Sequence, residues 1–226
     1  KAVIVEKPLA GNADEGRSMA QAARESGKIL MVEMKWRFLP QLLAARRFIA
    51  DGGIGRPYYA EAIGFQHRGI PGRSFIRKQM AAGGALMDNG VYCLDAVLHL
   101  LGHPQPLTVS GTAANVFGHS PDGGWDPEQF DVEDTGSAYV RLAGGTSLYF
   151  AQTWAIDFDE QCLIRVAGDG GSVQVRPFGP EPKLRLRSGG YTDLRDVDPG
   201  PLPAGEPEVG YAVGQFVDAI EASRPS

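Results

Sequence analysis

Three residues with reactive side chains recur at helical spacing in one stretch of the chain. Asp88, Tyr92 and Asp95 occupy positions i, i+4 and i+7 of a segment that is predicted to be helical from residue 88 to 101. Side chains at this spacing project from one face of a helix. Two carboxylates and a phenol in a cleft could hold substrate hydroxyls and exchange a proton. On spacing alone, a stripe of this kind is more often exposed to solvent.

A fourth reactive side chain, Lys7, follows a short apolar run, residues 2–5, that is typical of a buried parallel strand. Open α/β sheets bind ligands at the carboxyl ends of such strands. An ammonium there could stabilise a developing alkoxide, although a solvated lysine before a rigid turn has the same local sequence. Pro8 would fix the backbone that aims Lys7, and a cis peptide bond is one way to do so.

The elements around Lys7 predict one crossover of a doubly wound sheet. Asn12 and Glu15 form a capping-box pattern, and Gly27 is placed to end the helix that they begin. A second apolar strand follows at residues 29–32. Residues 2–34 are therefore predicted to fold as strand, helix and strand, with the right-handed connection usual for parallel strands.

Beyond residue 34 the pattern predicts helices at 39–50, 88–101 and 211–221, and then a mainly antiparallel sheet. In the last helix, Val213, Phe216, Val217 and Ile220 would share one side. Period-2 alternation, as at residues 137–142 and 183–187, indicates about five to seven strands with one half-covered face. Asp134 is expected to cap or turn the chain. The fold class is α/β followed by α+β, with an open-faced sheet covered by helices on one side.

Composition excludes several classes of protein. The 226 residues carry 22 Lys and Arg against 27 Asp and Glu, a net charge of -5 that argues against a nucleic-acid-binding protein. No apolar run is long enough to cross a membrane. Cys93 and Cys162 are the only cysteines, and they are expected to be free thiols. His99 and His103 lack a third ligand at useful spacing, so no metal site is expected. A cytoplasmic location is the default expectation.

Three motifs together resemble the Gfo/Idh/MocA oxidoreductase family: Glu6-Lys7-Pro8, residues 34–40 (MKWRFLP) and residues 83–92 (GGALMDNGVY). The resemblance covers nearly the whole chain. It implies a nicotinamide-dependent enzyme that uses NAD or NADP. It also implies an N-terminal Rossmann domain and a C-terminal domain whose open sheet holds the substrate and often mediates oligomerisation.

The resemblance also implies roles for individual residues. Lys7 would bridge the substrate oxygen and the cofactor, and Asp88 matches the family's motif aspartate. Tyr92 falls where many members have a histidine acid/base. In this it resembles the glucose-fructose oxidoreductase and dihydrodiol dehydrogenase branch, where a tyrosine serves as the proton donor. Asp95 would bind a substrate hydroxyl. The cofactor would contact residues of the first two motifs, namely Glu6, Lys7, Pro8, Trp36 and Arg37.

The mechanistic hypothesis is that Tyr92 exchanges the hydroxyl proton while Lys7 stabilises the alkoxide and lowers the pKa of the phenol. Asp88 and Asp95 would orient substrate hydroxyls. Trp154 is expected either to line the substrate pocket or to pack as a core aromatic. Trp36 could instead pack at the domain junction, and Arg37 could pair with an acid.

The chain departs from the family because no G-x-G-x-x-G loop follows its first strand. By the resemblance, about 90 to 100 residues of a Rossmann fold are expected to be missing before Lys1. Residues 1–34 are thus interpreted as the C-terminal remnant of a dinucleotide-binding domain, and residues 35–226 as the substrate-binding and oligomerisation domain. Dinucleotide binding by this fragment is expected to be weak or absent.

The preferred interpretation is an NAD(P)-dependent oxidoreductase that interconverts a secondary alcohol and a ketone or lactone. Its substrate would be a small sugar, polyol or dihydrodiol, and a homodimer or higher homo-oligomer would form through the open sheet face. The alternative is a non-catalytic module, a carbohydrate-binding or dimer-forming domain that keeps the family fold.

Overall fold

The computed structural model describes residues 1–120, 123–189, 193–201 and 208–223. Its N-terminal part is the predicted crossover: β1 (Val3–Val5) and β2 (Leu30–Val32) pair in parallel and are joined by α1 (Ala13–Ser26). Asn12 Oδ1 accepts from the Glu15 amide at 3.0 Å, and Gly27 ends α1 in the left-handed conformation at φ 61°. The Glu15 carboxylate accepts from the Gly11 amide, so the capping box is displaced by one residue.

The second sheet has eight strands in the order β10-β9-β8-β7-β3-β6-β5-β4. All neighbouring strands are antiparallel except β3 and β6. Their bounds are β3 (Pro57–Phe65), β4 (Pro106–Ala114), β5 (Thr135–Leu142), β6 (Ser147–Thr153), β7 (Gln161–Gly168), β8 (Gly171–Val175), β9 (Leu184–Ser188) and β10 (Arg195–Val197). The sequence predicted five to seven strands, and β10 lies in a Pro- and Gly-rich stretch where no strand was expected.

Helices connect and cover these strands. The longer ones are α2 (Pro40–Ala50), α4 (Val91–Leu101) and α5 (Glu208–Ala222), and the shorter ones are η1 (Lys35–Phe38), η2 (Arg73–Ile76), α3 (Lys78–Ala81), η3 (Leu86–Gly90) and η4 (Pro127–Gln129). The segment predicted as one helix from residue 88 begins two residues earlier, as the π-helical turn η3.

Glu133 holds the start of this helical segment. Its carboxylate accepts from the amides of Gly84 and Leu86 at 2.9 and 3.1 Å, and its carbonyl accepts from Ala85. These contacts supply acceptors for N–H groups that have no partner within the helix. Gly84 is required here because a Cβ atom would lie 1.8 Å from the Glu133 carbonyl oxygen.

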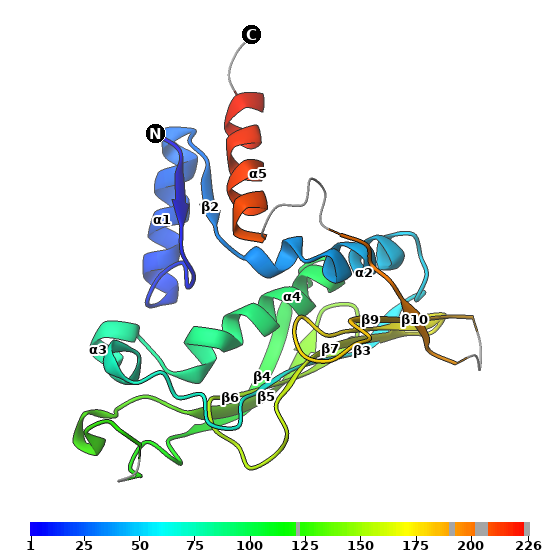
Figure 1. The fold of residues 1–226 in the computed structure, drawn as a ribbon. Helices are drawn as coiled ribbons and strands as arrows, with labels where there is room; N and C mark the ends of the chain where they lie inside the picture. Colours follow the sequence, from blue (N-terminus) through cyan, green and yellow to red (C-terminus); the bar gives the residue numbers. More distant parts are fainter. Residues whose placement is uncertain (121–122, 190–192, 202–207, 224–226) are drawn as a thin grey trace.

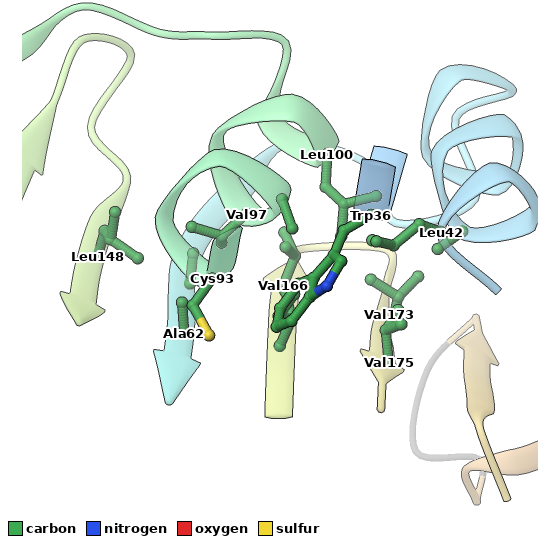
Figure 2. Packing of buried hydrophobic residues seen from close by; sticks show 14 of the residues in the cluster. Trp36, Leu42, Ala62, Cys93, Val97, Leu100, Leu148, Val166, Val173 and Val175 are labelled. Carbon is green, nitrogen blue, oxygen red and sulfur yellow. The ribbon is translucent and has the colours of Figure 1, made fainter. Parts of the chain in front are cut away.

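The core lies between one face of the large sheet and the helices α2 and α4 (Figure 1). Figure 2 shows side chains from α2, α4 and the strands meeting in this layer; Leu42, Val97, Leu100, Leu148, Val166, Val173 and Val175 are all at most 1% exposed. The opposite face carries exposed aromatics, including Tyr139 at 48% and Tyr149 at 37%. The prediction of a sheet covered on one side is confirmed.

The last helix, α5, packs on η1. Phe216 is 9% exposed and Ala212 is fully buried, but Val213 and Val217 are 42% and 45% exposed. The buried contact of α5 therefore runs along Ala212 and Phe216, and the apolar side predicted from the sequence is only partly covered.

Candidate functional site

Lys7 and Asp88 form an ion pair that joins the small sheet to the start of α4. Lys7 Nζ donates to Asp88 Oδ1 and to the Asp88 carbonyl oxygen, both at 2.8 Å. The two side chains are only 15% and 14% exposed. The Lys7–Pro8 peptide bond is cis. The structure thus brings together two motifs that lie 81 residues apart in the sequence.

Tyr92 lies next to this ion pair, one helical turn after Asp88. Lys7 Nζ is 4.9 Å from the centroid of the Tyr92 ring, and Lys35 Nζ is 5.7 Å from it. Trp36 stacks on Tyr92 with ring centroids 5.0 Å apart and an interplanar angle of 15°. An ammonium and a phenol from distant segments therefore occupy one site, with an aromatic wall beside them.

The expected effect of Lys7 on the phenol was wrong. Burial first, and then the negative charges of Glu6, Glu33 and Asp88, raise the pKa of Tyr92 to about 12. The Lys7 ammonium, 4.9 Å from the centroid of the ring, does not offset these effects. At neutral pH, the phenol is accordingly protonated and suited to donate a proton.

The Asp88 carboxylate is held on both oxygens. Trp154 Nε1 donates to Oδ2 at 3.2 Å, while Lys7 holds Oδ1. Trp154 is fully buried, so the expectation that it lines a substrate pocket is corrected: it packs as a core aromatic that positions Asp88. Asp88 in turn positions Lys7. The Asp88 carboxylate is therefore less free to orient a substrate hydroxyl than the hypothesis from the sequence required.

Arg37 and Asp95, expected at separate cofactor and substrate contacts, bind each other. Arg37 Nε donates to Asp95 Oδ2 at 2.8 Å and Nη2 donates to Oδ1 at 2.5 Å. This bidentate bond raises the pKa of Arg37. The pair ties η1 to α4, and only Arg37, at 35% side-chain exposure against 14% for Asp95, keeps substantial open surface.

Sequence reasoning missed Glu33. It follows β2 as Glu6 follows β1, so both carboxylates lie at the carboxyl edge of the small sheet. Burial raises the pKa of Glu33, and so do the charge of Glu6 and a hydrogen bond between the two carboxyl groups. Glu33 Oε1 is buried and has no hydrogen-bond partner among the residues that the structure describes. The signal that could have identified Glu33 in the sequence is its position directly after an apolar strand, which matches that of Glu6.

The residues at this edge fit the nicotinamide end of a dinucleotide. The buried acceptor Glu33 Oε1 needs a donor, which a carboxamide could provide. Trp36, 7% exposed and stacked on Tyr92, supports this edge from within the core. Glu6, Lys7 and Pro8 form the same edge. A pyrophosphate is usually bound by a glycine-rich turn between a strand and a helix. The described residues contain no such turn: the connection from β1 to α1 runs through Lys7 and Pro8 to the helix cap at Asn12.

A cavity of about 250 Å³ adjoins this group of residues. Trp36 lines it and also stacks on Tyr92, whereas Lys7, Asp88 and Tyr92 themselves do not line it. Its other walls carry amides, an acid, thiols and an aromatic ring, including Gln66, Asn89, Gln152, Glu160, Cys162 and Phe178. Asn89 Nδ2 donates to Gln66 Oε1 at 3.0 Å. The sequence analysis did not identify these amides.

The described residues include no group of three or more His, Cys, Asp and Glu side chains that could hold a metal ion. Within the same residues, no helix has the length and apolar character needed to span a membrane.

Comparison with known proteins places the chain among oxidoreductases. Residues 42–174 match the model of the GFO/IDH/MocA C-terminal domain. The chain is 29% identical over 182 residues to a D-glucoside 3-dehydrogenase of Escherichia coli, covering 77% of this chain and 52% of that protein. It is 33% identical over 177 residues to the trans-1,2-dihydrobenzene-1,2-diol dehydrogenase of Mus musculus, covering 78% and 48%. The chain thus spans about half the length of these relatives.

Solved structures show the same fold. An aldose-aldose oxidoreductase from Caulobacter crescentus, complexed with glycerol, superposes with a TM-score of 0.81 at 23% identity, covering 99% of this chain and 63% of that one. An NAD binding oxidoreductase from Klebsiella pneumoniae superposes with a TM-score of 0.71 at 25% identity, covering 86% and 53%. With the family model matching more than half of its residues, the chain belongs to the Gfo/Idh/MocA oxidoreductase family and contains its C-terminal domain.

Proposed function

We propose that the chain is part of an NAD(P)-dependent oxidoreductase that interconverts a secondary alcohol and a ketone or lactone on a sugar, polyol or dihydrodiol. The observation that carries the proposal is the convergence of the Lys7 ammonium, the Asp88 carboxylate and the Tyr92 phenol at one site. The names of the glucoside and dihydrodiol dehydrogenases support this class of substrate.

In the reductive direction, Tyr92 donates its proton to the carbonyl oxygen of the substrate. A phenol with a pKa of about 12 is protonated at neutral pH and holds that proton until negative charge develops on the oxygen. Lys7 stabilises the alkoxide, and the two bonds from Lys7 Nζ to Asp88 fix its position. The nicotinamide, when bound, supplies or accepts the hydride.

The cofactor would lie along the carboxyl edge of β1 and β2, in contact with Glu6, Lys7, Pro8 and Trp36. Arg37 would contribute a positive charge beside the ring. The division into a dinucleotide-binding remnant at residues 1–34 and a substrate-binding domain at residues 35–226 follows from this assignment. The adjoining cavity would take the part of the substrate that lies away from the reacting carbon.

The test compares two tyrosine variants in a form of the protein extended upstream of Lys1. Tyr92→Phe should lower kcat roughly 100-fold or more, which is the usual effect of losing a general acid. Tyr58→Phe is the matched control, because Tyr58 is 57% exposed at the start of β3, whereas the other end of that strand lines the cavity. Wild-type turnover by Tyr92→Phe would contradict the assignment.

Cofactor binding separates the enzyme from a non-catalytic module. Titration with NADH and NADPH, followed by fluorescence, should give weak or no binding to the 226-residue chain and clear binding to the extended form. Failure of the extended form to bind either dinucleotide would favour a carbohydrate-binding or dimerisation module.

A second copy of the chain is the proposed partner of the open sheet face. Tyr59, Tyr139 and Tyr149 are 37%, 48% and 37% exposed on this face, where Tyr139 on β5 lies directly opposite Tyr149 on β6. Light scattering should show a homo-oligomer, and Tyr149→Glu should shift it toward the monomer. A monomeric wild-type chain at the concentrations used for the assay would contradict this assembly.

A further inference from the structure

The two cysteines, 69 positions apart in the sequence, meet at the floor of the cavity. Cys162 on β7 lies directly opposite Gly64 on β3, and opposite residues of paired strands have their Cβ positions about 5 Å apart. Cys93 lies on α4 above the same glycine: a Cβ atom built on Gly64 would be 3.0 Å from Cys93 Sγ. Figure 2 shows the Cys93 sulfur directed from α4 toward the sheet.

Gly64 is what lets the thiols approach each other. Any side chain at residue 64 would occupy the space into which Cys93 Sγ projects, and a Cβ there would also be 2.1 Å from Gln152 Oε1. Cys93 Sγ is 3.7 Å from that same Gln152 oxygen. The thiols are thus held in a small polar recess formed by β3, β6, β7 and α4.

The two thiols differ in access. Cys93 is 1% exposed, whereas Cys162 is partly exposed, and both belong to the wall of the cavity of about 250 Å³. A hydrogen bond with the Cys162 thiol and burial raise the pKa of Cys93. The Cys93 thiol therefore stays protonated, and Cys162 is the sulfur that a small molecule entering the cavity would reach first.

We propose that Cys162 and Cys93 form a modification site at which hydrogen peroxide converts two free thiols into an intramolecular disulfide. The Cys162 thiol loses its proton and attacks peroxide as the thiolate, so an S–O bond forms, the O–O bond breaks, and the leaving hydroxide takes up that proton to become water. Cys93 then attacks the resulting sulfenic acid, an S–S bond forms, the S–O bond breaks, and the Cys93 proton leaves with the hydroxide as water. Two thiols are oxidised, and one peroxide is reduced to two waters.

The disulfide would tie α4 to β7 directly beside the candidate site. Cys93 follows Tyr92 in the sequence and lies one turn after Asn89, which also lines the cavity. A bridge across the floor of the cavity would fix the start of α4 relative to the sheet. The modification is defined by thiol chemistry alone, so its test does not depend on the proposed dehydrogenase activity.

The experiment treats the fully reduced chain with increasing hydrogen peroxide, blocks the remaining thiols with iodoacetamide, and analyses intact and proteolysed protein by mass spectrometry. The wild type should lose two hydrogens, take up no iodoacetamide and yield one peptide pair joined through Cys93 and Cys162. The same product should form at high dilution, as an intramolecular bond requires.

Two single variants serve as matched controls. In Cys93→Ser, the Cys162 sulfenic acid cannot be resolved and should be trapped by dimedone. In Cys162→Ser, the buried Cys93 thiol should resist both peroxide and iodoacetamide in the folded chain. A wild-type chain that keeps both thiols, or that accumulates Cys162 sulfinic acid without the joined peptides, would overturn the proposal. So would dimedone labelling confined to Cys93.

Discussion

Two buried carboxylates in this molecule have their charges satisfied in different ways. Asp134 is fully buried and accepts only from backbone amides, those of Val116, Phe117 and Gly118, at 2.6 to 3.1 Å. Asp88 accepts from two side chains, Lys7 Nζ and Trp154 Nε1, which come from the small sheet and from the end of β6.

The difference separates a structural carboxylate from one suited to chemistry. Backbone amides cannot move or exchange their proton without unfolding a turn, so Asp134 fixes a loop and nothing else. The partners of Asp88 are a titratable ammonium and an indole, and one of them, Lys7, contacts the Tyr92 ring. The Asp88 carboxylate, held by side chains from remote segments, thus fixes the position of Lys7 relative to Tyr92.

The largest expected effect that tests the comparison of Asp134 with Asp88 is the loss of folding stability when Asp134 is replaced. Asp134→Ala removes the acceptor of three N–H donors, one of them buried and two partly buried, and an unsatisfied buried donor costs about 1 to 3 kcal/mol. The free energy of unfolding, measured by urea denaturation, should fall by about 3 kcal/mol. Asp134→Asn, which keeps one acceptor oxygen, should lose less. Equal midpoints for Asp134→Ala and the wild type would remove the distinction.

Lys7→Met should have the opposite effect from Asp134→Ala, a small loss of stability and a large loss of turnover. The unfolding free energy should fall by only about 1 kcal/mol, because the pair keeps some contact with solvent. In the extended form, kcat should fall roughly 100-fold, because the alkoxide loses its cation.

Arg165→Met is the matched control for this ion pair, since Arg165 pairs with Glu61 at 3.0 Å on the open face of the sheet. That variant should leave kcat unchanged. An equal loss of turnover in both variants would show that Lys7 acts through stability rather than chemistry.

Asp95→Asn should have a smaller effect on stability than Asp134→Ala. It weakens a bidentate bond in which Arg37 remains 35% exposed, so the loss should be about 1 kcal/mol. A double-mutant cycle with Arg37→Met measures the coupling between the two side chains. A coupling energy near zero would show that the pair does not hold η1 against α4.

The smallest effect is spectroscopic and concerns Tyr92. Its pKa of about 12 in the folded chain exceeds the ordinary value of 10.0. The stability gained from burying the neutral phenol is therefore complete below pH 10 and is lost as the pH rises through about 12. Near-ultraviolet absorbance after a rapid pH jump, before unfolding, should show a high-pH tyrosine step that Tyr92→Phe lacks. Its persistence in the variant would assign the step elsewhere.

Local sequence patterns predicted the elements well where one rule decides the structure. The Asn12 cap, the Gly27 stop and the parallel pairing of β1 with β2 follow from short-range chemistry, and the structure confirms them. Strand β10 was missed because Pro and Gly dominate its surroundings, and its pairing with β9 is a tertiary contact that local propensity does not encode.

The candidate site was predictable as a set of residues but not as a set of interactions. The motifs placed Lys7, Asp88 and Tyr92 together, and the structure does bring them into contact. The pairing of Arg37 with Asp95 and the raised pKa of Tyr92 depend on distances and burial between remote segments. Spacing within one helix cannot supply those quantities.

The central strand of the large sheet also constrains how the chain is synthesised. β3 pairs with β6 and β7, both of which lie some eighty or more residues further along the sequence. A nascent chain that has left the ribosome only as far as α4 has made the strand but neither of its neighbours. Contacts between such distant residues slow folding, so β3 must remain unpaired, or be shielded by a chaperone, until the second half of the sheet emerges.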